Sequence, residues 1–278
     1  IGQRLLSSIK TGILNKISVE DIESLLIPEK FDTSKQVYYE DTSKYSRAEK
    51  LYKSAESLFY RLIDYNGEEE YLKFFYVMKN IDANRLDPVY YTNFYTKLYK
   101  LIQKDTYEIK WQEVKELVEI KVAKKPDIDE KQKIRYFQLS DIDTNLSIIK
   151  ETHEELYGNL SSRMRYIVRS GEIVTAKGGS ATGTKGHATA FIMEEFDGMV
   201  TTDALYNLIP KGINPYYLFF LFKQPVILNQ IDMFTKGTVY KLIQKSDFEK
   251  IRIPRIGSEL EEQIGERILS YLTLLRIT

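Results

Sequence analysis

The feature that most constrains the fold is a short segment repeated near the two ends of the chain. Residues 16–28 read KISVEDIESLLIP, and residues 242–254 read LIQKSDFEKIRIP. The copies share several aligned hydrophobic residues, an Asp, a Glu and a closing proline, Pro28 or Pro254. Because internal repeats mark repeated structural units, we expect the end of one unit followed by a complete second unit.

An amphipathic helix pattern follows each copy. Hydrophobic residues recur at three- and four-residue steps over 43–64 and again from Ser258 onward. The two stripes could pair with each other, or each could pack on its own domain, and periodicity alone favours neither. The seam expected for a pair contains Leu51, Ala55, Leu58 and Leu62 on the first helix and Leu260, Ile264, Ile268 and Leu272 on the second.

Between residues 111 and 254 short hydrophobic runs alternate with Gly, Asp and Ser turns, which is typical of strands. The expected strands are 117–122, 135–139, 173–176, 189–193, 199–202, 205–209 and 250–253. A helix broken at Pro225, or a helix pair, is expected over 215–230, and another helix opens at Asp87-Pro88. The predicted fold class is α+β, with helices packed on a mixed sheet.

Composition excludes several classes of protein. Lys plus Arg and Asp plus Glu both number 40, so the chain is neutral and a broad non-specific binder of polyanions is disfavoured. The absence of cysteine excludes disulfides, zinc fingers and thiol nucleophiles. No hydrophobic run approaches the roughly 20 residues that span a bilayer, and no signal segment opens the chain. We expect a cytoplasmic protein without a membrane partner and, from Ile1 and Thr278 at its ends, a fragment of a longer chain.

Catalytic motifs are incomplete. Residues 178–185, GGSATGTK, resemble a phosphate-binding loop but lack its Gly-Lys-Ser/Thr ending. Residues 87–90, DPVY, lack the second proline of the adenine methyltransferase motif, and no glycine-rich cofactor loop precedes them. Glu119 and Lys121 match half of a nuclease metal site, a pattern frequent by chance. We therefore predict no catalytic residue, metal or cofactor, with a nuclease as a remote alternative.

The two histidines, His153 and His187, lie far apart in the sequence. A single histidine without a partner is more often a surface residue than a metal ligand or base. We expect both to lie on the surface.

Two loops carry the positive functional signal. Residues 161–187 hold five basic side chains and one acidic side chain, and this segment contains a run rich in Gly, Ser and Thr. Glycines let a backbone approach a ligand, and Ser, Thr and Lys donate hydrogen bonds to phosphates and base edges. A similar loop is 235–241. Each loop alone is equally typical of a solvated turn. The predicted DNA contacts are Lys177, Ser180, Thr182, Thr184, Lys185, Lys236, Thr238 and Lys241.

In the order of its motifs, the chain resembles the specificity subunit of type I restriction-modification enzymes. The resemblance rests on an ordered set of motifs over 85–278: RLDPVYY at 85–91, IRYFQLSDID at 134–143, SGEIVTAKGG at 170–179, VTTD at 200–203, NPYYL at 214–218, KGT at 236–238, IRIP at 251–254 and EQI at 262–264. Residues 1–65 resemble the end of a preceding recognition domain and its conserved helix.

The resemblance implies a domain plan and a role. Residues 1–41 would be the tail of a preceding recognition domain, 42–84 a spacer helix and connector, 85–256 a target-recognition domain and 257–278 a truncated second helix. In the family the two long helices pair antiparallel and dock methyltransferase subunits, and each recognition domain reads half of a split double-stranded DNA site. The implied partners are DNA, DNA methyltransferase subunits and, as an optional component, the restriction subunit.

Two alternatives stay open. The chain could be the recognition region of a fused adenine-specific methyltransferase, that is, a type IIG restriction enzyme whose catalytic part lies upstream. It could also be a helix-driven protein-interaction module with no role on DNA. The sequence does not give the DNA target or the stoichiometry.

Overall fold

The computed structural model describes residues 37–65, 93–237 and 240–276, with the side chains of 37–43, 93 and 94 left aside. The chain divides into two compact units, 1–43 and 44–278, and the second contains nearly all described residues. The first repeat copy, the Asp87-Pro88 helix start and Thr238 lie outside the described residues. None of the described helices is long and apolar enough to cross a membrane.

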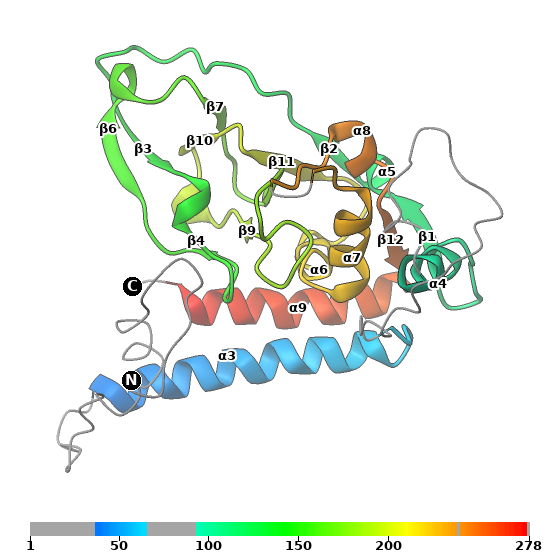
Figure 1. Cartoon of the computed structure of the whole chain (residues 1–278). Helices are drawn as coiled ribbons and strands as arrows, with labels where there is room; N and C mark the ends of the chain where they lie inside the picture. Colours follow the sequence, from blue (N-terminus) through cyan, green and yellow to red (C-terminus); the bar gives the residue numbers. More distant parts are fainter. Residues whose placement is uncertain (1–36, 66–92, 238–239, 277–278) are drawn as a thin grey trace, which may run out of the picture. The chain divides into compact units, whose positions relative to one another are not determined.

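Two four-stranded sheets form the centre of the second unit (Figure 1). One is antiparallel and has the order β2-β11-β8-β9; its strands are β2 (Val118–Ile120), β8 (Ile173–Ala176), β9 (Thr189–Phe191) and β11 (Leu205–Pro210). The other is mixed, because β10 pairs parallel with β3, and has the order β6-β3-β10-β7; its strands are β3 (Lys133–Phe137), β6 (His153–Leu156), β7 (Met164–Ile167) and β10 (Val200–Thr202).

Two short ribbons complete the strands: β1 (Lys110–Glu113) with β12 (Arg252–Arg255), and β4 (Ile142–Asp143) with β5 (Ile148–Ile149). All seven predicted strands overlap an observed strand. The sequence analysis missed β1, β4, β5, β6 and β7. In β6 the burial pattern alternates without a fully buried residue, so no hydrophobic run marks that strand.

The helices are α3 (Val37–Tyr60), α4 (Asn93–Ile102), α5 (Val114–Leu117), α6 (Pro215–Leu221), α7 (Pro225–Phe234), α8 (Lys245–Phe248) and α9 (Ser258–Leu275). The predicted break at Pro225 is confirmed. Proline is tolerated in the first turn of a helix, where its missing N–H is not needed, and both α6 and α7 begin with one. The Asn214 side chain caps α6 by accepting hydrogen bonds from the backbone N–H groups of Tyr216 and Tyr217.

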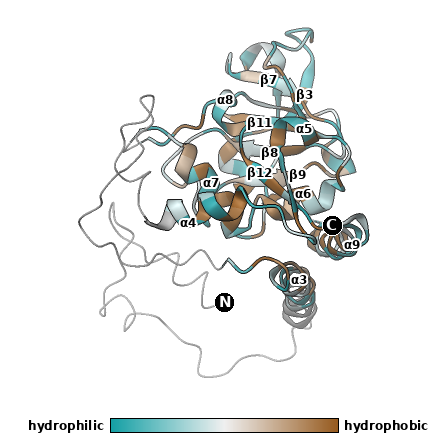
Figure 2. Ribbon diagram, turned by 90° about the vertical axis from the view of Figure 1, so that its right-hand side faces the viewer, coloured by the Kyte–Doolittle hydropathy of each residue, from teal (hydrophilic) through white to brown (hydrophobic). Residues whose placement is uncertain are grey.

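Helices α3 and α9 lie side by side in both ribbon views (Figures 1 and 2), and the sequence colours of Figure 1 show that they run antiparallel. Lys44 Nζ, near the start of α3, donates to the Arg276 carbonyl just after α9, at 2.9 Å. Near the middle of the pair, Arg267 Nε donates to Ser54 Oγ at 3.1 Å. The α+β class and the antiparallel helix pair are therefore both confirmed.

The buried stripe of α3 is rotated by about one residue from the predicted seam. Ala48, Ala55, Phe59 and Ile63 are fully buried, whereas Leu51, Leu58 and Leu62 are only partly buried. On α9, Ile264, Ile268 and Leu272 are buried and Leu260 is partly buried.

The two packing alternatives turn out not to exclude each other. Both helices belong to one hydrophobic core that also contains α6 and α7. The Phe59 ring of α3 lies edge-on against Phe220 of α6 at a centroid distance of 5.5 Å. Gly265 lets α9 approach α6, because a Cβ there would lie 2.5 Å from the Asn214 side chain. The helix pair is thus fixed to the sheet domain.

Candidate nucleic-acid interface

The structure joins the two predicted loops into one surface. The β8–β9 loop (177–188) and the α7–α8 loop (235–244) are connected by backbone hydrogen bonds: Gly179 N–H donates to the Lys241 carbonyl, and Ile243 N–H donates to the Lys177 carbonyl, both at 2.9 Å. An antiparallel bridge between Gly178 and Leu242 lies between these bonds. Two segments that are far apart in the sequence therefore present their side chains together.

Glycines make this close contact possible. A Cβ on Gly178 would lie 2.7 Å from the Lys241 carbonyl oxygen and 3.1 Å from both the Leu242 and Tyr240 side chains. Gly183 has φ +76°, a conformation that other residues rarely adopt. A Cβ there would lie 2.6 Å from the backbone nitrogen of Asp232 in α7.

His187 organises the inside of the β8–β9 loop, so the expectation that it lies on the surface is wrong. Its side chain is 1% exposed. Nδ1 accepts a hydrogen bond from Gly183 N–H at 3.3 Å, and Nε2 lies 2.8 Å from Thr175 Oγ1. Burial, with a smaller effect of the Lys223 charge, lowers the pKa of His187 to about 3. The ring is therefore neutral, donating to Thr175 through Nε2–H.

Lys223, in the α6–α7 junction, holds the end of the same loop from outside. Its ammonium donates to the carbonyls of Thr144 at 2.8 Å, His187 at 3.2 Å and Lys185 at 3.4 Å. Burial lowers the pKa of Lys223 to about 8, against a smaller opposite effect of Asp143. The sequence analysis missed this residue, although a single lysine within the hydrophobic run 215–228 was a signal that could have found it.

The predicted DNA contacts differ in exposure. Ser180, Thr184, Lys185 and Lys236 are exposed. Thr182 is 2% exposed, and its hydroxyl has no hydrogen-bond partner. The remaining described residues, Lys177 and Lys241, are partly buried.

The lysines of this surface differ in how freely their charge is available. Lys241 pairs with Asp232, and Lys236 pairs with Asp247 at 3.3 Å. The Lys177 ammonium lies 4.9 Å from the ring centroid of Tyr206 and 5.6 Å from that of Tyr166. Burial lowers the pKa of Lys177, partly offset by Asp203. Within the described residues no acidic side chain pairs with Lys185, so its charge is the most available of the four.

Ion pairs also reduce the excess charge of the basic segment. Arg163 pairs with Asp203 at 3.0 Å, and Arg169 pairs with Asp197 at 3.2 Å. The sole acid of the segment, Glu172, is buried and pairs with Lys121, while also accepting from Asn207 Nδ2 at 2.8 Å. The sequence count therefore overstated the charge that this segment offers to a ligand.

The incomplete enzyme motifs do not assemble into sites among the described residues. Glu119 pairs with Lys211 at 2.7 Å, and Lys121 pairs with Glu172, so the nuclease-like pair points to other partners. The 178–185 loop opens no helix, since β9 follows it. The DPVY motif at 87–90 lies outside the described residues.

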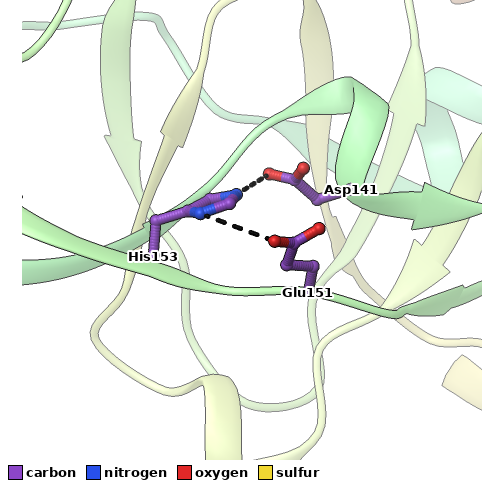
Figure 3. Close-up of side chains that lie close together, drawn as sticks. All are labelled: Asp141, Glu151 and His153. Carbon is purple, nitrogen blue, oxygen red and sulfur yellow. Dashed lines mark ion pairs between the residues drawn. The ribbon is translucent and has the colours of Figure 1, made fainter.

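His153, partly buried, belongs to a small cluster with Asp141 and Glu151 (Figure 3). Its Nε2 lies 3.2 Å from Asp141 Oδ2, and its Nδ1 lies 4.0 Å from Glu151 Oε1. In the described parts of the chain, this is the only group of three His, Asp or Glu side chains whose ligand atoms lie close enough together to share a metal ion. Asp141 Oδ2 already accepts the backbone N–H of Gln138 at 2.7 Å, so local hydrogen bonding accounts for the position of this carboxylate.

Comparisons with known proteins agree with this architecture. The family described as type I restriction modification DNA specificity domain matches residues 104–276. A solved structure reported for complex assembly and conformational transition of the type I R-M system aligns with 62% of this chain and 43% of its own, at 22% identity and a TM-score of 0.51. That likeness concerns the fold.

The HsdS subunit from Thermoanaerobacter tengcongensis aligns over 61% of this chain and 43% of its own, at 22% identity and a TM-score of 0.49. This chain therefore spans less than half the length of either structure. No curated protein matches the sequence.

Proposed function

Because the chain belongs to the family of type I restriction modification DNA specificity domains, with the match covering most of its length, we propose that it reads a specific sequence in double-stranded DNA. The reading surface consists of the joined β8–β9 and α7–α8 loops. Its proposed contacts are the exposed Ser180, Thr184, Lys185 and Lys236. Lys177 and Lys241 would contact DNA after leaving their present partners, the tyrosine rings and Asp232. Thr182 is buried and would act by holding the loop from inside. Thr238 remains a proposed contact from the sequence alone.

The observation that carries this proposal is the joining of the two loops by the Gly178–Leu242 bridge and its flanking hydrogen bonds. Sequence reading needs donors held in fixed register against base edges, whereas a solvated turn has no reason to be fixed from three sides. The β8–β9 loop is fixed by His187 inside, by Lys223 at its end and by α7 beneath Gly183.

The helix pair supplies the proposed partner site. We expect DNA methyltransferase subunits, and a restriction subunit where the system has one, to dock on α3 and α9, so that the chain determines where its partners act. The residues that we propose for the contact between α3 and α9 themselves are those of the predicted seam. We expect the chain itself neither to bind S-adenosylmethionine nor to methylate or cut DNA, and we place it in the cytoplasm with its partners.

The test is selection from a pool of random-sequence duplex DNA with the 278-residue chain. We expect enrichment of one defined sequence. Ser180→Ala is the sharpest variant, because its hydroxyl is exposed and its loss leaves the backbone of the loop intact; one good base contact discriminates by about 1–3 kcal/mol. The proposal is supported if Ser180→Ala enriches a different sequence, or a less strictly defined one, than the wild-type chain does. Equal recovery of all sequences by the wild-type chain would refute it.

A further inference from the structure

The junction between α6 and α7 contacts the β8–β9 loop and helix α3 through two consecutive residues. On one side, Lys223 donates to the carbonyls of Lys185 and His187 in the loop and of Thr144 in the β4–β5 turn. An ammonium has three donors and no acceptor, so these three carbonyls can use its full hydrogen-bonding capacity. Lys223 thereby fixes the backbone directly beside the exposed Lys185.

On the other side, Gln224 is fully buried and contacts α3. Its Nε2 donates to Tyr52 Oη at 3.0 Å, and its Oε1 accepts from Tyr60 Oη at 2.9 Å. These tyrosines lie two helical turns apart on α3, so Gln224 bridges a length of the helix. The junction is therefore hydrogen-bonded to α3 at two places.

We propose that Lys223 is a positioning residue for sequence recognition, holding the β8–β9 loop in the register that reads DNA, and that Gln224 fixes this position relative to the helix pair. The inference rests on the proposed function of the loop. Lys223 is partly buried and its ammonium is occupied by three backbone carbonyls, so its role is exerted through the loop and not by contact with DNA.

The physical consequence separates two kinds of binding. Attraction to phosphates depends on how many cations the surface offers and is tolerant of register. Base reading depends on where each donor lies. Removing the Lys223 ammonium leaves three carbonyls without this donor, and the loop gains freedom to shift. Sequence-specific affinity should then fall, while non-specific affinity changes little.

The experiment measures the ratio of affinities of the full 278-residue chain for its selected duplex and for a scrambled duplex. Lys223→Met keeps the length of the side chain and removes the donors. We expect the ratio to fall by about tenfold, the discrimination carried by one base contact. The matched control is Lys211→Met, which removes the same charge from an exposed lysine at the end of β11 that pairs with Glu119 of β2. We expect this control to keep the ratio.

Hydrogen exchange of the amides of residues 182–188 provides a readout that needs no DNA. We expect faster exchange there in Lys223→Met and unchanged exchange in Lys211→Met. If Lys223→Met does not fold, Lys223→Gln, whose shorter side chain reaches fewer carbonyls, replaces it under the same criteria. The double variant Tyr52→Phe/Tyr60→Phe tests the α3 connection and should lower the affinity ratio in the same direction.

Three results would overturn the inference. An unchanged ratio in the Lys223 variant, whether both affinities stay the same or fall in parallel, would show that Lys223 has no special role in sequence reading. An unchanged ratio in the double tyrosine variant would remove α3 from the proposal. If the wild-type chain selects no sequence, the proposed function itself fails, and this inference with it; a folded Lys223 variant with altered ratio is possible only when the proposed function holds.

Discussion

Gly183 of the β8–β9 loop lies against Asp232 of α7 so closely that a Cβ at position 183 would be 2.6 Å from the Asp232 backbone nitrogen. Asp232 in turn accepts hydrogen bonds from Tyr95 of α4 and from Lys241 of the α7–α8 loop. One aspartate therefore lies where both loops meet the helices. Its position explains how segments from different parts of the chain are held as one surface.

We predict that Gly183→Ala destabilises the chain more than Gly212→Ala. Both glycines have positive φ, +76° and +65°, so both substitutions incur the roughly 1–2 kcal/mol cost of left-handed backbone. Only Gly183 adds a clash, since nothing lies within 4 Å of a Cβ on Gly212. Urea unfolding of the two variants measures the difference. Equal losses of unfolding free energy would show that the loop can move away from α7 without cost.

Neutralising Lys185 should flatten the salt dependence of DNA binding. Each phosphate contact that is lost reduces the log-log salt slope by about 0.9, and Lys185 has the most available charge of the loop lysines. Adding Lys177→Met should reduce the slope further, but by less than the Lys185 substitution does, because Lys177 is partly buried against two tyrosine rings. Binding is measured by fluorescence anisotropy at several salt concentrations. A slope identical to wild type in the double variant would place this loop away from the DNA.

Ile268→Ala should cost about 2–5 kcal/mol of unfolding free energy, because the side chain is fully buried in the core shared by α3 and α9. Leu58→Ala should cost less, since Leu58 is only partly buried. The control is Leu269→Ala, which removes a side chain of the same size that is 37% exposed on the next position of α9 and should cost clearly less than Ile268→Ala, because less of its surface is removed from water. Chemical denaturation ranks the three variants, and a control as damaging as Ile268→Ala would contradict the assignment of the buried face.

The stability of the chain should fall on acidification partly through His187. The folded pKa of about 3 lies below the ordinary value of 6.5, so between these values the unfolded chain binds more protons than the folded chain. His187 therefore contributes stability that is present above pH 6.5 and is lost as the pH falls toward 3, at up to about 1.4 kcal/mol per pH unit.

Comparison with His187→Gln isolates this effect from that of the carboxylates. The variant should be less stable than wild type at pH 7.5, because it loses the hydrogen bonds to Thr175 and Gly183. Its unfolding free energy should then decline less steeply with acidification, as measured by urea unfolding between pH 7.5 and 4.5. Parallel declines in the two proteins would show that His187 takes up a proton in the folded chain as readily as in the unfolded chain.

The sequence by itself determined the elements that depend on local pattern. Alternating and continuous hydrophobic runs located seven strands, and Pro225 located the break between α6 and α7, because proline disrupts a continuing helix and is accepted in a first turn. The stripes of 43–64 and from Ser258 onward located the two amphipathic helices, while their antiparallel pairing was implied only by the family resemblance. The ordered motifs indicated the family, since their residue types and order are carried by the chain itself.

Only the tertiary structure decided which side chains of the candidate site are available. Thr182 and Lys185 lie three residues apart in one polar loop, yet one is buried and the other exposed. Lys241 and Lys236 have acidic partners supplied by Asp232 and by Asp247, pairings that no loop composition specifies. Lys223 contacts Lys185 and His187, which lie 38 and 36 residues earlier in the chain. Such long-range contacts arise from packing of separate elements, and a local pattern contains no information about which elements meet.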